Sequence, residues 1–377
     1  MNAPERQQPA AAPAAGPSLA ARLTIDLAAI AANWRALDAL SAPGVETAAV
    51  VKADAYGLGV PAVAPALARA GARIFFVALP HEGVALRQAL AGGPAADAAV
   101  YILGGYMGGD RAAFETAALR PVLNSLAQGA AWFQGGPAGP AALQLDSGMN
   151  RLGIEPGEVA QLGPLPDGIE LVMSHLACAD DPTHPQNAAQ RQAFAAMADA
   201  ILATLPAGRT LPTLSLAATG ATLLGAPYHY GLTRPGIGLF GGLPFADARP
   251  VVRLEAPIIQ IRDVAPGEAV GYGAAFVADT PRRIATISTG YADGLIRAAG
   301  GGAEAAIAGR RVPYAGRVSM DLITLDVTGH PAAAAGDPVE LIGPTVALDA
   351  LAAAAGTIGY EILTSLGPRY SRRYLPD

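Results

Sequence analysis

Lys52 is a residue type that can act as a nucleophile or a base. It stands in the segment VVKADAYGLG (residues 50–59), directly after apolar residues that are typical of a buried strand. Burying an unpaired ammonium group costs free energy, so such a lysine lowers its pKa or takes another form, for example a Schiff base. A lysine at the end of a strand more often reaches solvent, so Lys52 by itself does not decide between these outcomes.

Four further apolar runs also end in polar residues. If parallel strands carry these runs in a barrel, their carboxyl ends meet at one face, where the active sites of such barrels lie. The sequence therefore predicts one polar site. Its other members come from LDSGMNRLG (145–153, with Arg151), SHLACAD (174–180, with His175), SLAAT (215–219, with Thr219) and LTRPGIGLFG (232–241, with Arg234).

From about residue 22 to 242, the elements that must position these residues alternate in a regular pattern. Short apolar, β-branched runs alternate with alanine-rich helical stretches, which predicts parallel β/α units. Eight such runs predict a (β/α)8 barrel of the TIM type. The expected strands are residues 48–53, 73–79, 99–104, 120–124, 143–148, 169–177, 213–219 and 230–237.

The pattern of expected elements changes after the glycine-rich LFGGLP segment. Closely spaced strands at residues 251–264, 282–289 and 319–327 predict a mainly antiparallel β domain. The expected division is a barrel over residues 19–243 and a β domain over residues 244–377. Residues 1–18 are rich in Pro and Ala and are expected to form a disordered tail.

Composition excludes several classes of function. The net charge of −6 gives no basic stripe for nucleic acid, and no apolar window is long enough for a membrane helix. Cys178 is the single cysteine, so the chain has neither an internal disulfide nor a thiolate cluster for a metal, and no metal is expected. Residues 1–18 do not resemble an export signal. A cytoplasmic enzyme acting on small molecules is the expectation.

The motifs together resemble those of alanine racemases, a family of fold-type III pyridoxal-phosphate enzymes. The resemblance extends over most of residues 22–375, with the motifs in the family's order. It also implies the architecture read above, a barrel followed by a β domain. Beyond VVKADAYGLG, the matching segments are LDSGMNRLG, SHLACAD, RPGIGLFG, VGYGAAF (270–276), STGYADGLIR (288–297), GRVSMD (316–321) and GYEILTSLGPR (359–369).

The resemblance assigns the cofactor contacts. It implies that Lys52 binds pyridoxal 5'-phosphate as a Schiff base and that the Tyr56 hydroxyl contacts the phosphate. The backbone amides of Gly236 and Ile237 are implied at the same phosphate, where Thr219 keeps a hydroxyl contact. Barrels commonly bind phosphate in the loops after their last strands.

Three further residues are implied around the cofactor ring. Arg234 resembles the arginine that faces the pyridine nitrogen, and because a guanidinium cannot accept a proton, that nitrogen stays unprotonated. This weakens the electron sink and favours simple proton movement over transamination or decarboxylation. His175 is implied to pack near the ring and to relay between Arg234 and Tyr272, and Arg151 is implied at the phenolic oxygen.

Tyr272 in VGYGAAF resembles the second catalytic base of the family. Racemisation needs two bases, because a proton removed from one face and returned to the other cannot use a single side chain. Tyr291, Met320 and Asp321 resemble residues at the mouth and wall of the substrate site. In this family the β domain of one subunit completes the barrel site of the other, so the resemblance implies a homodimer with shared active sites.

The sequence departs from the family pattern at several positions. Gln144 stands where some members carry a carbamylated lysine that orients the arginine matched by Arg151, and a neutral amide can hold Arg151 only by hydrogen bonding. Ala217, Ala218 and Thr219 replace the usual Ala-Asn-Ser, which puts cofactor affinity in doubt. Leu295 and Ile296 stand where an aromatic residue and a proline are common.

The function implied is the interconversion of L-alanine and D-alanine, either to supply peptidoglycan precursors or to degrade D-alanine. A racemase of broader specificity, such as for serine or lysine, stays open because specificity lies in the pocket walls. A fold-type III decarboxylase fits less well, since Tyr272 would have no role in it. A non-catalytic pyridoxal-phosphate binding protein also stays open, although that class is a single barrel without the second domain.

Overall fold

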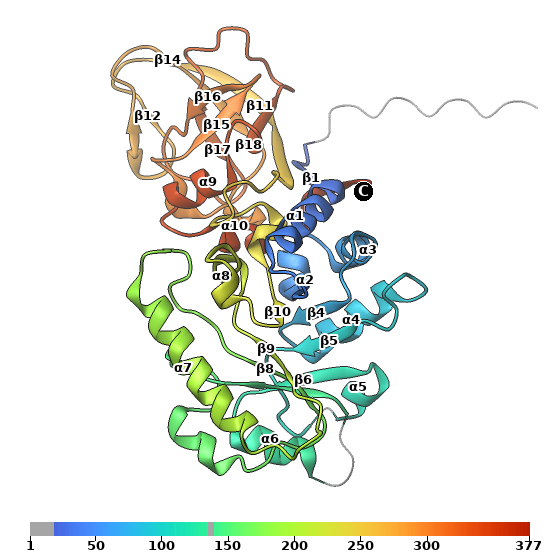
Figure 1. Cartoon of the computed structure of the whole chain (residues 1–377). Coiled ribbons are helices and arrows are strands. Elements are labelled where there is room, and N and C mark those ends of the chain that lie inside the picture. The colour runs from blue at the N-terminus through green and yellow to red at the C-terminus, as the bar shows by residue number, and fades with distance from the viewer. Residues whose placement is uncertain (1–18, 110, 135–138) are drawn as a thin grey trace, which may run out of the picture.

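Eight short strands form the centre of the larger part of the molecule, in the lower part of Figure 1. The computed structural model describes residues 19–109, 111–134 and 139–377. The tail expected over residues 1–18 lies outside the described part. The eight strands are β3 (Ala49–Val50), β4 (Ile74–Val77), β5 (Ala99–Ile102), β6 (Leu119–Leu123), β7 (Ala141–Gln144), β8 (Ile169–Met173), β9 (Thr213–Ser215) and β10 (Leu232–Thr233).

These strands close into a parallel barrel, which confirms the predicted (β/α)8 fold. Strands β3 to β9 pair in sequence order, and β10 pairs with the short β2 (Glu46–Thr47). The ring closes on both sides of β10: the Val50 N–H donates to the Pro235 carbonyl at 3.0 Å, and the Arg234 N–H donates to the Ala217 carbonyl at 2.7 Å. All eight predicted runs therefore contribute strands.

Helices follow the strands and cover the outside of the barrel. Apolar residues on their inner faces, such as Val63 and Leu67, are fully buried. The helices of this part are α1 (Leu27–Leu40), the short α2 (Lys52–Tyr56), α3 (Val60–Ala70), α4 (Pro80–Leu90), α5 (Arg111–Thr116), α6 (Leu126–Phe133), α7 (Pro185–Leu202) and α8 (Thr219–Leu223).

A sheet of mixed but mainly antiparallel strands makes up the second part, at the top of Figure 1, as predicted. The long strand β11 pairs antiparallel with β1, β14 and β18. The elements are β11 (Val252–Val264), β12 (Ala269–Val270), β13 (Phe276–Val277), β14 (Arg282–Ile287), β15 (Glu304–Ile307), β16 (Arg310–Pro313), β17 (Ile323–Asp326), β18 (Pro338–Ile342), β19 (Ser371–Leu375), α9 (Leu348–Ala354) and α10 (Gly359–Ser365).

The first strand of the described chain belongs to this second sheet and not to the barrel. β1 (Arg22–Asp26) lies between β11 and β19, antiparallel to the former and parallel to the latter. The chain then enters α1, whose first turn is capped by the Asp26 carboxylate accepting the Ala29 N–H at 2.9 Å. Buried residues of both parts belong to one continuous apolar core.

Candidate active site

A pocket of about 490 Å³ opens at the carboxyl ends of the barrel strands. The structure brings all eight residues expected at the cofactor to its walls: Lys52, Tyr56, Arg151, His175, Thr219, Arg234, Gly236 and Ile237. They come from several different strand ends and their loops, as the barrel geometry requires.

Lys52 begins a turn of unusual handedness. The sequence predicted that the strand would continue to residue 53, but the strand ends at Val50, and α2 (Lys52–Tyr56) is a left-handed turn with φ between 53° and 55° at Ala53, Asp54, Ala55 and Tyr56. Burial lowers the pKa of Lys52, and so does the charge of Arg151, whereas Glu82 acts to raise it. The lysine is therefore held partly desolvated, in a setting that favours its neutral amine.

One local hydrogen bond and two from the distant strand β19 fix this turn. The Asp54 carboxylate accepts the Val60 N–H at 2.7 Å. From β19, the Arg372 guanidinium donates to the Gly57 carbonyl at 2.6 Å, and the Tyr374 hydroxyl donates to the Leu58 carbonyl at 2.9 Å. Non-glycine residues in the left-handed region cost roughly 1–2 kcal/mol each, so these contacts stabilise a conformation that the local sequence disfavours.

Arg234 and His175 form the polar wall of the pocket. Arg234 is buried and donates to the Ser215 hydroxyl and, at 2.6 Å, to the Ser174 carbonyl. Burial lowers the pKa of Arg234 to about 9, so it stays a cation at neutral pH. Burial also lowers the pKa of His175 to about 3, helped by the charges of Arg234, Arg151 and Lys52. His175 is therefore neutral.

Hydroxyl groups and glycines meet at the far end of the pocket. The Thr219 hydroxyl accepts the N–H groups of Gly236 at 3.0 Å and Gly238 at 3.4 Å. A Cβ at Gly236 would collide with the Tyr56 hydroxyl, so position 236 must be glycine for the two to approach. Burial raises the pKa of Tyr56 strongly, which keeps this hydroxyl protonated and able to donate.

The loop that carries Arg151 is built around a buried carboxylate. Asp146 accepts the N–H groups of Gly148 and Met149 at 2.9 Å and of Asn150 at 3.1 Å. Burial acts to raise the pKa of Asp146, but these backbone donors outweigh it and the pKa is lowered. Gln144, at the end of β7, is buried and lines the same pocket as Arg151.

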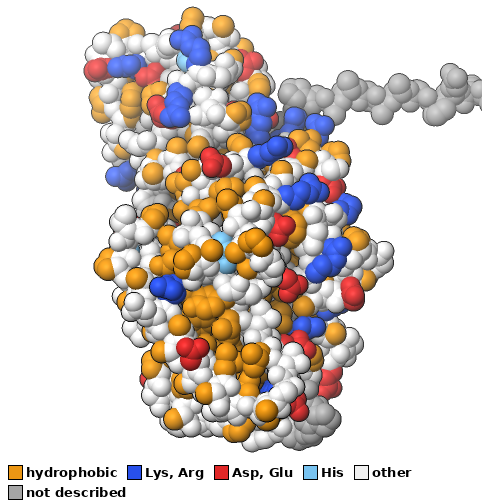
Figure 2. All heavy atoms as spheres, in the orientation of Figure 1, with side chains coloured by type: hydrophobic (Ala, Val, Ile, Leu, Met, Phe, Trp, Pro, Cys, Tyr) orange, Lys and Arg blue, Asp and Glu red, His pale blue; other side chains and the backbone are white. Residues whose placement is uncertain are grey.

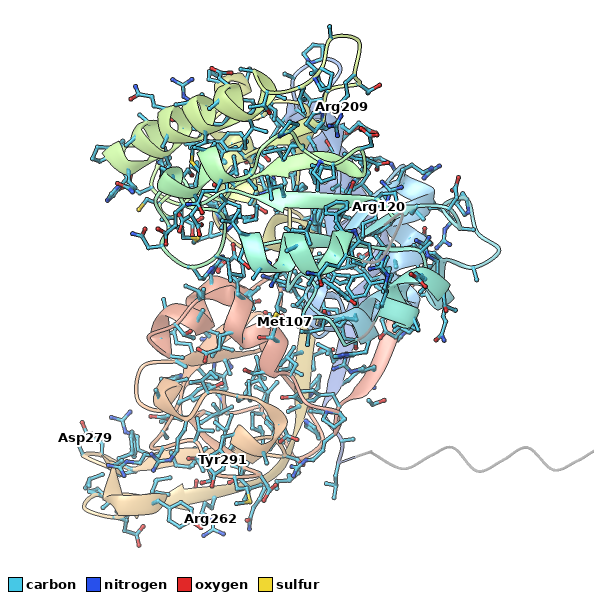
Figure 3. The ribbon with its side chains drawn as sticks, turned by 90° about the horizontal axis from the view of Figure 1, so that it is seen from below. Met107, Arg120, Arg209, Arg262, Asp279 and Tyr291 are labelled. Atoms are coloured by element: carbon cyan, nitrogen blue, oxygen red, sulfur yellow. The ribbon has the colours of Figure 1, made fainter. Side chains whose placement is uncertain are left out.

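The predicted residues of the β domain lie outside this pocket. Tyr272 stands between β12 and β13 and is 72% exposed, and Tyr291 and Met320 are 41% and 54% exposed. Figure 3 shows Tyr291 within the β domain, away from the barrel in which Arg120 is labelled. The Tyr291 and Met320 loops are joined, since the Ala292 N–H donates to the Met320 carbonyl at 2.9 Å, and Asp321 accepts from Arg369 at 2.7 Å.

Two site residues were missed by the sequence analysis. Tyr360 of α10 lines the pocket, and its ring lies 6.0 Å from the ring of Tyr56. The motif GYEILTSLGPR contained it, but nothing local indicated that α10 packs against α2. Glu82 is the other: it does not line the pocket, but it accepts the Ala53 N–H directly after Lys52, and its position at the start of α4 looks like that of an ordinary capping residue.

Comparisons with known proteins agree with this geometry. The family model described as "Alanine racemase, N-terminal domain" matches residues 25–244, and "Alanine racemase, C-terminal domain" matches residues 251–374. The alanine racemase of Cereibacter sphaeroides is 53% identical over 356 residues, covering 94% of this chain and 98% of that protein. The alanine racemase of Acidiphilium cryptum is 50% identical, covering 93% and 97%.

Solved structures of alanine racemases are also similar to this chain. The alanine racemase of Bartonella henselae with covalently bound pyridoxal phosphate is 37% identical with a TM-score of 0.86, over 94% of this chain and 99% of that one. The biosynthetic alanine racemase of Pseudomonas aeruginosa is also 37% identical with a TM-score of 0.86, over 95% and 100%. The chain belongs to the alanine racemase family.

Proposed function

We propose that this protein interconverts L-alanine and D-alanine with pyridoxal 5'-phosphate held by Lys52, and that Lys52 and Tyr272 are its two bases. One observation carries the proposal: Lys52 is the only lysine among the 25 Lys and Arg residues of the chain. Arginine supplies every other basic side chain, but a guanidinium cannot form a Schiff base. The only side-chain amine of the chain therefore lies in this pocket.

The residues present fit this cofactor. The Tyr56 hydroxyl, the Thr219 hydroxyl and the backbone of Gly236 meet at one end of the pocket, and we assign the phosphate to this end together with the Ile237 amide. Arg234 would face the pyridine nitrogen, His175 would pack near the ring, and Arg151 would contact the phenolic oxygen. When bound, pyridoxal phosphate withdraws electrons from the substrate and so acidifies its Cα–H bond.

The two bases divide the proton transfers between them. The Lys52 Nζ would exchange the proton on one face of Cα, and the hydroxyl of Tyr272 of the partner subunit would exchange it on the other. Tyrosine has a reference pKa near 10, so its phenolate needs nearby support, and neutral His175 backed by cationic Arg234 would provide it. Arg234 stays a cation and accepts no proton.

We further propose that the protein acts as a homodimer with shared sites. The exposure of Tyr272, Tyr291 and Met320 supports this arrangement, because a second barrel could cover them. Tyr291, Met320 and Asp321 would then line the entry to the partner's pocket, where Arg151 would meet the substrate. The β domain would span residues 244–377 together with β1, and the barrel would begin at α1 and end near residue 243.

A cytoplasmic role completes the proposal, either in supplying D-alanine for peptidoglycan or in degrading it, and a single cysteine suits that compartment. None of the helices in the described ranges is long and apolar enough to cross a bilayer. On the face drawn in Figure 2, acidic and basic side chains are interspersed, which gives nucleic acid no continuous basic surface there.

A chiral assay of the purified protein against a panel of L-amino acids tests the function. We expect racemisation of L-alanine and its loss in Lys52→Arg. Equal or faster racemisation of serine or lysine would show broader specificity. Cofactor binding without racemisation of any amino acid would show a non-catalytic binding protein.

A further inference from the structure

The Glu82 carboxylate connects two chain segments that are distant in sequence. Its Oε2 accepts the N–H groups of Ala78 at 2.7 Å and Leu79 at 3.0 Å, at the end of β4. Its Oε1 accepts the Ala53 N–H at 2.7 Å, directly after Lys52. One side chain on α4 therefore fixes the ends of two neighbouring barrel strands.

Capping of α4 explains only half of this arrangement. Glu82 is the third residue of α4, and by accepting the N–H of the N-cap residue Leu79 it makes the bond that a glutamate at this position makes in a capping box. The bond to Ala53 has no role in α4, because Ala53 lies 29 residues earlier and belongs to the left-handed turn.

The Ala53 bond lies where the Lys52 turn needs support. The far end of the turn is held by Arg372 and Tyr374 through the carbonyls of Gly57 and Leu58. At the near end, the first amide after Lys52 is held by Glu82. Since isolated left-handed residues are disfavoured, releasing either end allows the turn, and Lys52 with it, to relax toward commoner conformations.

The charge of Glu82 also acts on Lys52. Three side chains interact electrostatically with the lysine: Arg151 from the loop after β7, His175 from the end of β8, and Glu82 from α4. Arg151 lowers the pKa of Lys52, as burial does, and Glu82 raises it. Glu82 therefore opposes the cationic side of the pocket.

We propose that Glu82 is a positioning residue for Lys52: its carboxylate ties the turn behind the lysine to the end of β4 and sets a negative charge beside the amine. The inference rests on the proposed role of Lys52 as the cofactor-binding residue. Only glutamate can both accept hydrogen bonds from the two segments and place a negative charge near the amine. Glutamine has a single acceptor oxygen, so it can serve Ala53 or the β4 end but not both. Aspartate keeps the charge but is one methylene shorter.

The single lysine gives a direct test. When the full-length protein is expressed with [ε-¹³C]lysine and freed of cofactor, it has one labelled side chain, and its NMR titration reports the pKa of Lys52. Glu82→Gln should lower that midpoint by roughly one unit, because an opposite charge is removed. Glu82→Asp should lower it less. Glu158→Gln is the matched control, since the Glu158 carboxylate caps η1 (Pro156–Gln161) through the Glu155 N–H and does not line the pocket.

The rate at which pyridoxal phosphate attaches to these cofactor-free proteins separates position from charge. A lower pKa supplies more neutral amine, so a charge effect alone would make attachment faster. Misplacement of Lys52 should instead slow attachment roughly tenfold or more in both Glu82 variants. Attachment that is unchanged or faster, or a midpoint unchanged in Glu82→Gln, would overturn the inference and leave Glu82 as a helix cap. Failure of the proposed cofactor role of Lys52 is distinguishable, because then the wild-type protein itself would not attach the cofactor there. Failure of the proposed racemisation is distinguishable too, because it appears only in the chiral assay.

Discussion

The Tyr56 hydroxyl lies so close to the Cα of Gly236 that no side chain fits between them. The Tyr56 ring is held from its other sides by Phe240, at a centroid distance of 4.7 Å, and by Tyr360 at 6.0 Å. Gly236→Ala should therefore destabilise the cofactor-free protein by roughly 1–3 kcal/mol through overpacking, measured by urea unfolding.

A second substitution checks the cause of that loss. Tyr56→Phe removes the hydroxyl that the new methyl group would meet, so the double variant should recover part of the stability lost in Gly236→Ala. Gly157→Ala is the control, because a Cβ at Gly157 meets nothing within 4 Å. Strictly additive effects of the two substitutions would show that the contact does not limit stability.

Reduction with borohydride should attach the cofactor irreversibly to Lys52. The purified protein should be yellow and lose its absorption band on reduction, and peptide mass mapping should find the reduced cofactor on the peptide containing residue 52. Since the chain has no second lysine, the α-amino group is the alternative site of attachment. Cofactor found there, or on no peptide at all, would contradict the assignment.

Activity should not depend on carbon dioxide. The Gln144 amide has no amine that can form a carbamate, so adding or removing bicarbonate should leave the rate unchanged. Gln144→Leu tests whether the amide holds Arg151 in the loaded enzyme, since loss of one such hydrogen bond should weaken cofactor binding by about 1 kcal/mol. Gln144→Glu, which adds a negative charge at the same place, should bind the cofactor at least as tightly as the wild type. A bicarbonate requirement would show that Gln144 has been misassigned.

Two inactive variants should restore each other's activity in mixed dimers. Lys52→Ala lacks the cofactor amine, and Tyr272→Ala lacks one base, a loss of roughly a hundredfold or more. A mixed dimer has one site with both lesions and one intact site, and random exchange makes about half of the dimers mixed. A fully exchanged equal mixture should therefore recover about a quarter of wild-type activity.

Exchange itself must be verified in that experiment. Recovery should follow mild unfolding and refolding, with mass spectrometry of differently tagged chains confirming mixed dimers. If exchanged mixtures stay as inactive as the parents, Tyr272 acts within its own subunit or is not the second base.

His175 should make the cofactor-free protein sensitive to acid. Its pKa is about 3 in the folded state against an ordinary value of 6.5, so below pH 6.5 the unfolded chain binds a proton that the folded chain does not. The free energy of unfolding should then fall by about 1.4 kcal/mol per pH unit, until the folded state also takes up the proton near pH 3. His175→Asn should flatten this slope, whereas His81→Asn, on the exposed surface of α4, should not.

Local patterns predicted the barrel well because each strand is a short apolar run between helices, and burial on both faces leaves little choice of structure. The same reasoning did not place β1. Its sequence, RLTID, alternates like any half-buried strand, and its pairing with β11 and β19 is decided by residues more than 200 positions away.

The site also divides into residues that local patterns predict and a conformation that distant residues decide. Lys52, Arg151, His175 and Arg234 were predictable because they stand at strand ends, which the fold itself collects. The left-handed turn after Lys52 was not, because ADAY has no local preference for it. Its support comes from Glu82 and from β19, through hydrogen bonds that span 29 to 316 residues of sequence.

The hydrogen bonds from β19 to the Lys52 turn imply an order in which the parts of the protein fold. Arg372, whose guanidinium donates a hydrogen bond to the Gly57 carbonyl, follows Gly57 by 315 residues and is therefore synthesised much later. Most of the barrel can fold while translation continues, but the turn behind Lys52 acquires its last two donors only when Arg372 and Tyr374 have left the ribosome. We expect a nascent chain stalled before residue 371 to bind the cofactor poorly, so that loading with cofactor marks the arrival of β19.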